Sequence, residues 1–127
     1  MKTVERNVLV LAYLGDTIYE NYVRRYLILQ GIANVNDLQK EAVSFVSARS
    51  QSRFVHMLME KEFFSEEELS VIMRARNYKT TSHPKNCSIT EYKYATGLES
   101  LIGYLSLENK NDRIDEIMEK ILGGTLC

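Results

Sequence analysis

Two acidic residues lie in strongly apolar stretches far apart in the chain, and each has a glycine within one helical turn. Asp16 follows Gly15, and Glu99 precedes Gly103 by four residues. A mid-helix glycine costs about 1 kcal/mol relative to alanine, but it lets a second helix approach closely. Two such helices could bring both carboxylates to one Mg²⁺ ion, which prefers oxygen ligands and can activate water. The alternative for Asp16 is a buried aspartate satisfied by hydrogen bonds, or a cap on a neighbouring loop.

The two motifs resemble those of a known family. Leu14-Gly15-Asp16 and the apolar run after it resemble the signature helix of the ribonuclease III family of double-stranded RNA endonucleases. Residues 97–105, GLESLIGYL, are similar to that family's second catalytic helix, in which a glutamate precedes an apolar-apolar-Gly step. The resemblance extends over nearly the whole chain and is greatest to the mini-ribonuclease III branch, the nuclease domain alone. It implies an all-α, ribonuclease III endonuclease-domain-like helical bundle that forms a two-fold homodimer.

The resemblance also implies roles for individual residues. Asp16 and Glu99 take the positions of catalytic, Mg²⁺-binding carboxylates. The family has four acids, in the patterns Glu-x-x-x-Asp and Asp-x-x-Glu, whereas this chain has Ala12 and Thr96 at two of those positions. The mini branch is similarly poor in acids. Thr96 could hydrogen-bond a metal-bound water, and Glu20, one turn after Asp16, is a further candidate for the outer shell. Alternatively, Glu20 forms an i,i+4 pair with an arginine on a solvated face, worth about 0.2–0.5 kcal/mol.

A basic segment is expected to contact RNA. The chain has a formal net charge of −1, which argues against a surface that is basic throughout. Residues 74–93, however, contain a single acid, Glu91, and five lysines or arginines, namely Arg74, Arg76, Lys79, Lys85 and Lys93. Cationic side chains suit the phosphates of a duplex, and double-stranded RNA is recognised mainly by shape and 2′-hydroxyls. The alternative is an ordinary solvated loop.

Cutting both strands of a duplex requires two sites. The resemblance implies a homodimer in which Tyr13 inserts into the partner subunit. A two-fold interface needs a self-complementary patch, and the first helix is apolar on more than one face. The mini branch implies a precursor of 23S ribosomal RNA as substrate and 5′-phosphate products. A ribosomal protein partner is left open by the sequence.

Bulk composition sets the remaining limits. With 127 residues, 45% of them hydrophobic and 26% charged, the chain is expected to form one domain over residues 1–127. The sequence has no apolar run long enough for a membrane span and no secretory signal pattern, so a cytoplasmic protein is expected. Cys87 and Cys127 have no metal-ligand spacing and are interpreted as incidental thiols.

Apolar periodicity and scarce helix breakers predict an all-helical chain. Helices are predicted over residues 4–29, from Asn36 or Asp37 to Val46, from Ser47 onward, over 65–77, over 90–107, and up to Gly123-Gly124. Ser65 and Glu68 are expected to form a capping box. The predicted inner face of the first helix comprises Val4, Val8, Leu11, Gly15, Ile18, Tyr22, Tyr26 and Leu29.

Three functions are compatible with these patterns. The favoured one is a Mg²⁺-dependent endoribonuclease for structured double-stranded RNA. The second is a catalytically inactive RNA-binding or ribosome-associated protein on the same fold, which the residues at positions 12 and 96 would permit. The third is an all-helical interaction module with no nucleic-acid role.

Overall fold

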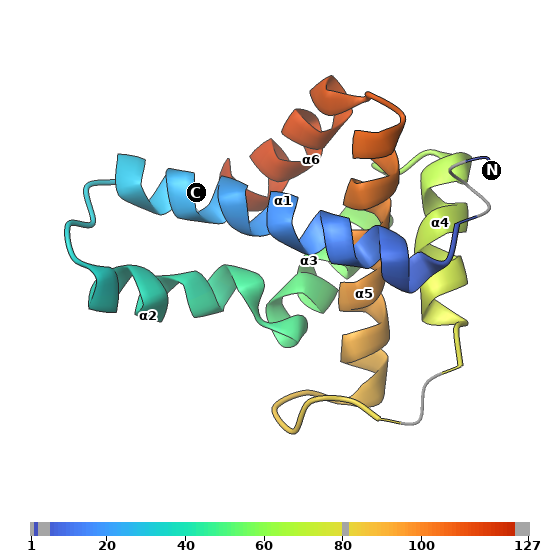
Figure 1. The fold of residues 1–127 in the computed structure, drawn as a ribbon, viewed down its shortest axis with the longest axis horizontal. Helices are drawn as coiled ribbons and strands as arrows, with labels where there is room; N and C mark the ends of the chain where they lie inside the picture. The colour runs from blue at the N-terminus through green and yellow to red at the C-terminus, as the bar shows by residue number, and fades with distance from the viewer. Residues whose placement is uncertain (1, 3–5, 80–81, 124–127) are drawn as a thin grey trace.

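The computed structural model describes residues 2, 6–79 and 82–123, and this part of the chain is all-helical (Figure 1). The helices are α1 (Val8–Leu29), α2 (Val35–Val46), α3 (Ala48–Glu60), α4 (Glu66–Arg76), α5 (Ile89–Leu107) and α6 (Asn111–Gly123). The predicted all-α fold class is confirmed. Within the described residues, none of these helices has the length and apolarity needed to cross a membrane.

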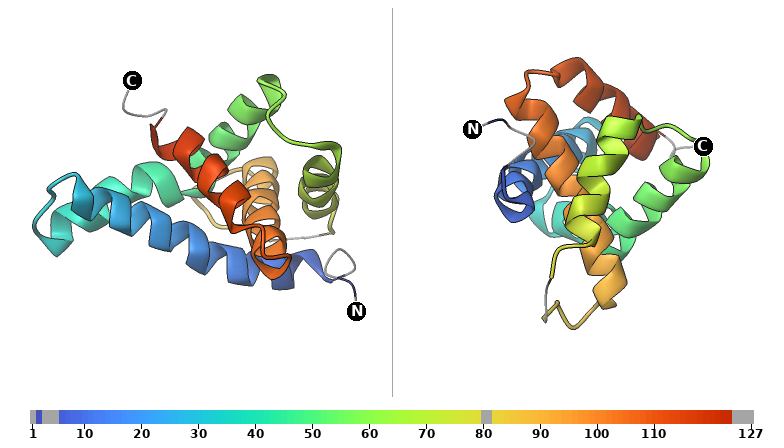
Figure 2. Two further views of the ribbon diagram at one scale, coloured as in Figure 1. Left: turned by 90° about the horizontal axis from the view of Figure 1, so that it is seen from above. Right: turned by 90° about the vertical axis from the view of Figure 1, so that its right-hand side faces the viewer.

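Helix α5 forms the centre of the molecule. All its residues from Ala95 to Leu105 are buried except Glu99, which is half-buried. Its main neighbours are α1, α4 and α3, and α6 packs across its C-terminal end (Figures 1 and 2). A helix that is apolar nearly all round can only be stable when other elements cover it on every side. The central position of α5 follows from its composition.

Helix α1 crosses α5 near its N-terminal half and then continues beyond it. Past the crossing, α1 and α2 run side by side and extend from the rest of the bundle, as Figures 1 and 2 show. The hydroxyl of Tyr19 on α1 is buried and donates to the Phe45 carbonyl on α2, at 2.6 Å. Burial of this phenol, together with the nearby charge of Glu99, raises its pKa.

The helix starts depart from the sequence prediction at two places. Helix α1 begins at Val8 because Asn7 caps it, accepting the Leu9 N–H at 2.7 Å, so the predicted start at Val4 is wrong. Val4 itself lies outside the described residues. Helix α2 is capped by Asn34, which accepts the Asp37 N–H at 2.9 Å, rather than by Asn36 or Asp37. Asn34 lies two residues before Asn36 and three before Asp37, and its side chain is the one that reaches a free N–H group at the start of α2.

Other boundaries agree with the prediction. Ser47 caps α3, and Ser65 with Glu68 forms the predicted capping box of α4. Helix α5 begins at Ile89, one residue before the predicted Thr90, and is capped by a second box of Ser88 and Glu91. Both boxes satisfy backbone N–H groups that would otherwise lack partners at a helix start.

The inner face of α1 is only partly as predicted. Val8, Leu11 and Gly15 are buried, but the second half buries Tyr19, Val23 and Leu27, while Leu29 is 78% exposed. Ile18, Tyr22 and Tyr26 are half-buried beside that face. The face shifts because α1 leaves α5 at this point and packs between α2 and α6.

Candidate active site

Glycine sits at both contact points where α1 crosses α5. A Cβ atom added at Gly15 would lie 1.7 Å from the Glu99 carbonyl oxygen, and one added at Gly103 would lie 2.0 Å from the Leu11 carbonyl oxygen. No side chain fits between the two backbones at either point. The close approach predicted from the sequence is therefore confirmed.

The crossing brings Asp16 and Glu99 together. Asp16 is exposed on α1, whereas Glu99 is half-buried on α5. Burial, and then hydrogen bonding and charge from the neighbouring Asp16 carboxyl, raise the pKa of Glu99 to about 8. Two carboxyl groups this close cannot both ionise freely in the absence of a cation. Residues from helices far apart in the sequence thus form one acidic pair that opens to solvent on the Asp16 side.

Three polar side chains support this pair. Ser100, fully buried next to Glu99 in the sequence, donates to the Val8 carbonyl at 2.7 Å and thereby ties α5 to the first turn of α1. Gln51 on α3, which is 2% exposed, places its amide nitrogen 3.5 Å from Glu99 Oε2. Tyr19 lies near enough for the Glu99 charge to affect it. The carboxyl of Glu99 is thus surrounded by α1, α3 and its own helix.

Sequence reasoning did not single out Gln51, Ser100 or Tyr19. A signal for Gln51 was present, because it precedes Val55 by four residues and Leu58 by seven, and both of those are fully buried. A polar residue at a core position of a helix is the informative exception to the hydrophobic pattern. Applying the helical period to polar residues as well would have found it.

Glu20 and Thr96 were predicted as candidates for an outer shell. Glu20 forms the alternative i,i+4 ion pair with Arg24, at 3.2 Å, and exerts a smaller electrostatic effect on Glu99. Thr96 is buried, and its hydroxyl donates to the Tyr92 carbonyl of its own helix at 2.9 Å. Their assignment to the outer shell stays a prediction.

The donor set fits a hard cation that keeps several waters. Among the described residues, His, Cys, Asp and Glu side chains form no group of three or more that could hold a metal, so the acids at the crossing are a pair. Two carboxylates on facing helices match the usual way Mg²⁺ is held, with water completing its shell. The side-chain amide oxygen of Gln51, the residue whose nitrogen faces Glu99, is buried and has no hydrogen-bond partner among the described residues.

The predicted RNA-contacting residues lie around the connection from α4 to α5. Arg74 and Arg76 are on the last turn of α4, Lys79 and Lys85 are exposed in the connection, and Lys93 is half-buried on α5. Arg74 donates to the Arg6 carbonyl, and Arg76 to the side chain of Asn77. The one acid of this segment, Glu91, is in an ion pair with Arg49, at 3.5 Å. The pairing leaves the segment net positive, as the sequence indicated.

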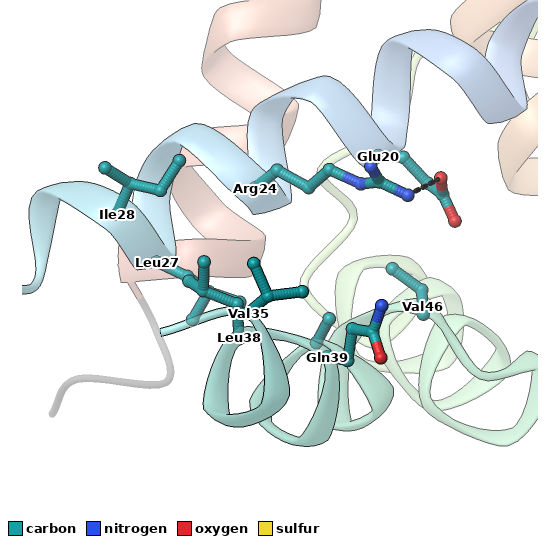
Figure 3. Close-up of a pocket in the computed structure, with 9 residues that line it drawn as sticks. Glu20, Arg24, Leu27, Ile28, Val35, Leu38, Gln39 and Val46 are labelled. Carbon is teal, nitrogen blue, oxygen red and sulfur yellow. Dashed lines mark hydrogen bonds and ion pairs between the residues drawn. The ribbon is translucent and has the colours of Figure 1, made fainter. Parts of the chain in front are cut away.

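A separate groove lies between α1 and α2 (Figure 3). Its walls are mostly apolar, and its charged rim consists of Glu20 and Arg24, which face one another across their ion pair. The residues lining it are Glu20, Arg24, Leu27, Ile28, Val35, Leu38, Gln39, Ala42 and Val46. Asp16 and Glu99 are absent from this lining. The groove is therefore distinct from the acidic pair.

Comparison with known proteins shows to which family the chain belongs. The family model of the ribonuclease III domain matches residues 9–110, which include both acids and both crossing glycines. The chain belongs to the ribonuclease III family. The predicted recognition is thereby confirmed, and with it the assignment of the chain to a family of endoribonucleases.

Several relatives of this ribonuclease III chain match over most of their length. It is 42% identical to the mini-ribonuclease 3 of Clostridium tetani, over 93% of this chain and 78% of that protein. It is 46% identical to the mini-ribonuclease 3 of Brevibacillus brevis, over 90% of this chain and 84% of that one. A crystal structure of a protein from Fusobacterium nucleatum, 35% identical, superposes with a TM-score of 0.83 and covers 95% of both chains.

Proposed function

We propose that this ribonuclease III chain is a Mg²⁺-dependent endonuclease for structured double-stranded RNA, with Asp16 and Glu99 as its metal-binding carboxylates. The observation that carries the proposal is that the two acids meet where α1 crosses α5, at a contact between glycine residues and the backbone of the facing helix. Mg²⁺, when bound, supplies activation of water and neutralisation of the charge that develops on the phosphate. The expected products carry 5′-phosphate and 3′-hydroxyl ends.

The two acids have different tasks in this proposal. Asp16 is exposed, so its carboxylate can reach a cation on the surface that an RNA backbone approaches. Glu99 lies deeper and is fixed by surrounding helices, so it sets the position of that cation. A cation would also offset the repulsion between the two carboxylates, which otherwise favours the protonated form of Glu99.

RNA contact is assigned to the basic segment, through Arg74, Arg76, Lys79, Lys85 and Lys93. These side chains come from α4, the connection after it and the start of α5. Most of them are exposed and can approach phosphates without rearrangement. Such contacts would hold a duplex in register without reading its sequence.

The working unit is proposed to be a homodimer in which Tyr13 contacts the partner. Tyr13 is 84% exposed, and Leu9 and Val10 on the same part of α1 are 42% and 55% exposed. Three large apolar side chains exposed together favour a buried interface. Tyr13 lies within one turn of Asp16, so a two-fold axis at this patch would bring two acidic pairs near one duplex.

Several relatives are named mini-ribonuclease 3, and the mini branch suggests a precursor of 23S ribosomal RNA, processed in the cytoplasm, as the natural substrate.

The deciding experiment incubates a base-paired RNA with the protein in Mg²⁺ or EDTA, beside Asp16→Asn. Asp112→Asn, an exposed aspartate on α6, is the matched control. Cleavage that needs Mg²⁺ and is lost only in the Asp16 variant supports the proposal. Binding without cleavage supports an inactive RNA-binding protein. The absence of both binding and cleavage supports the all-helical interaction module.

A further inference from the structure

Gln51 is a buried polar residue on the first turns of α3, where the helix meets the acidic pair. Its amide nitrogen lies 3.5 Å from Glu99 Oε2 and 3.4 Å from the Val46 carbonyl. A glutamine amide carries two N–H donors, so one nitrogen can serve both acceptors. Gln51 thereby joins α3 to Glu99 on α5 and to the last residue of α2.

The C-terminus of α2 accepts a second hydrogen bond, from α1. The last C=O groups of a helix lack partners within it. The Phe45 carbonyl accepts the buried Tyr19 hydroxyl, and the Val46 carbonyl accepts from Gln51. Ser47 then ends α2 and caps α3. The junction between α2 and α3 is therefore fixed to α1 and to the Glu99 carboxyl by two buried side chains.

Stability alone does not account for glutamine at this position. The buried amide oxygen of Gln51 has no hydrogen-bond partner among the described residues. An unsatisfied buried acceptor costs about 1–3 kcal/mol, whereas methionine, which has a similar shape, carries no such penalty. Methionine lacks the N–H donors that face the Val46 carbonyl and the Glu99 carboxylate.

We propose that Gln51 is a positioning residue that holds the Glu99 carboxylate in the orientation needed to share a cation with Asp16. This inference rests on the proposed function of the acidic pair. Groups that hydrogen-bond a metal ligand orient it, and removing them lowers metal affinity or activity by about 10–100-fold. Gln51 does not itself contact the reacting atoms.

The test compares Gln51→Met with Gln39→Met, an exposed glutamine on α2, in the full chain. We expect Gln51→Met to keep a cooperative melting transition in EDTA, to show a smaller Mg²⁺-induced rise in Tm, and to need at least about tenfold more Mg²⁺ for half-maximal cleavage. Its kcat should fall while KM for RNA stays constant, since RNA contacts are elsewhere. Wild-type Mg²⁺ dependence and kcat in Gln51→Met would overturn the inference.

A measurement on the unaltered side chain covers the case in which Gln51→Met fails to fold. The chain has three glutamines, at positions 30, 39 and 51, and only Gln51 is buried. Its side-chain amide signals, identified by slow hydrogen exchange, should shift when Mg²⁺ is added and shift less in Asp16→Asn. Signals that ignore Mg²⁺ would contradict the proposal. If they respond but wild type cleaves no RNA, the nuclease function fails and the positioning role stands.

Discussion

The α-carbon of Gly15 lies directly against the backbone of Glu99, so closely that a methyl group there would come within 1.7 Å of the Glu99 carbonyl oxygen. A residue beside one acid thus contacts the main chain of the other. The spacing of the two carboxylates is set by contact between helix backbones rather than by the side chains of a loop.

Gly15→Ala should destabilise the protein by about 3 kcal/mol or more and abolish cleavage, because α1 and α5 must separate to admit the methyl group. Chemical denaturation and a cleavage assay measure the two effects. Gly123→Ala is the control, since a Cβ there meets no atom within 4 Å and alanine favours a helix. A Gly15→Ala protein of wild-type stability would contradict the packing described.

The stability of the metal-free protein should fall as pH rises from about 5 to 8. Burial and the adjacent Asp16 raise the pKa of Glu99 to about 8, above that of the unfolded chain. The folded state therefore holds a proton that the unfolded state has released, and this advantage is lost as Glu99 ionises. Melting in EDTA across this range should give a flatter curve for Glu99→Gln than for wild type. Mg²⁺ should restore wild-type stability at pH 8 but have less effect on the variant. Parallel pH curves for the two proteins would refute this.

Glu68 and Arg113 should stabilise the fold without affecting catalysis. Arg113 donates to both carboxylate oxygens of Glu68, at 2.8 and 2.9 Å, and also to the Phe63 carbonyl. Arg113→Met should cost about 2–4 kcal/mol, because it leaves a buried carboxylate unpaired. The exposed Glu116→Gln removes the outer contact of Arg113 and should cost about 0.5 kcal/mol or less. A comparable loss in both variants would show that burial of the pair does not matter.

The same pair predicts an acid-dependent loss of stability. Burial opposes ionisation of Glu68, but hydrogen bonds from Arg113 and Ser65 prevail and lower the pKa of Glu68. Its contribution is therefore present above the ordinary glutamate pKa and is lost as pH falls through the lowered one. Between about pH 5 and 3, the free energy of unfolding should fall more steeply with pH for wild type than for Glu68→Gln. Equal slopes would mean that Glu68 is not the group responsible.

Lys79→Ala and Lys85→Ala should each weaken duplex RNA binding and reduce its salt dependence by about one phosphate contact. Lys120→Ala makes the same charge change on α6, at the opposite end of the molecule from the connection between α4 and α5 (Figures 1 and 2), and should leave the salt slope unchanged. Binding measured at several salt concentrations separates the two. An equal loss in all three variants would indicate attraction to overall charge rather than a defined contact.

Tyr13→Asp should convert the proposed dimer into a monomer, because it places a charge within the exposed apolar patch of Leu9, Val10 and Tyr13 on α1. Sedimentation velocity gives the state directly. The monomer should retain its helical content, since Tyr13 makes no contribution to the core. A wild-type chain that sediments as a monomer at micromolar concentration would rule out this interface.

Much of the site could be predicted because its main determinants are local. Gly15-Asp16 and Glu99 with Gly103 are marked by residues that weaken a helix in its most apolar part, and such a cost points to a close crossing. The shift of the inner face of α1 to Tyr19, Val23 and Leu27 could not be read the same way, because it depends on where α1 leaves α5 and meets α2 and α6. The cap at Asn34 was missed because three neighbouring polar residues compete for one start, and only the geometry of the chain selects among them.

The crossing of α1 and α5 has a consequence for the behaviour of the protein on heating. The contact between the two helices is made by backbone atoms, which have no side-chain rotamers that could change on warming. The distance between the two acids should therefore stay constant for as long as α1 and α5 remain packed. We expect catalysis to persist up to the melting transition and then to vanish with it in a single step. An enzyme whose carboxylates sat on a surface loop would instead lose turnover well before it unfolded.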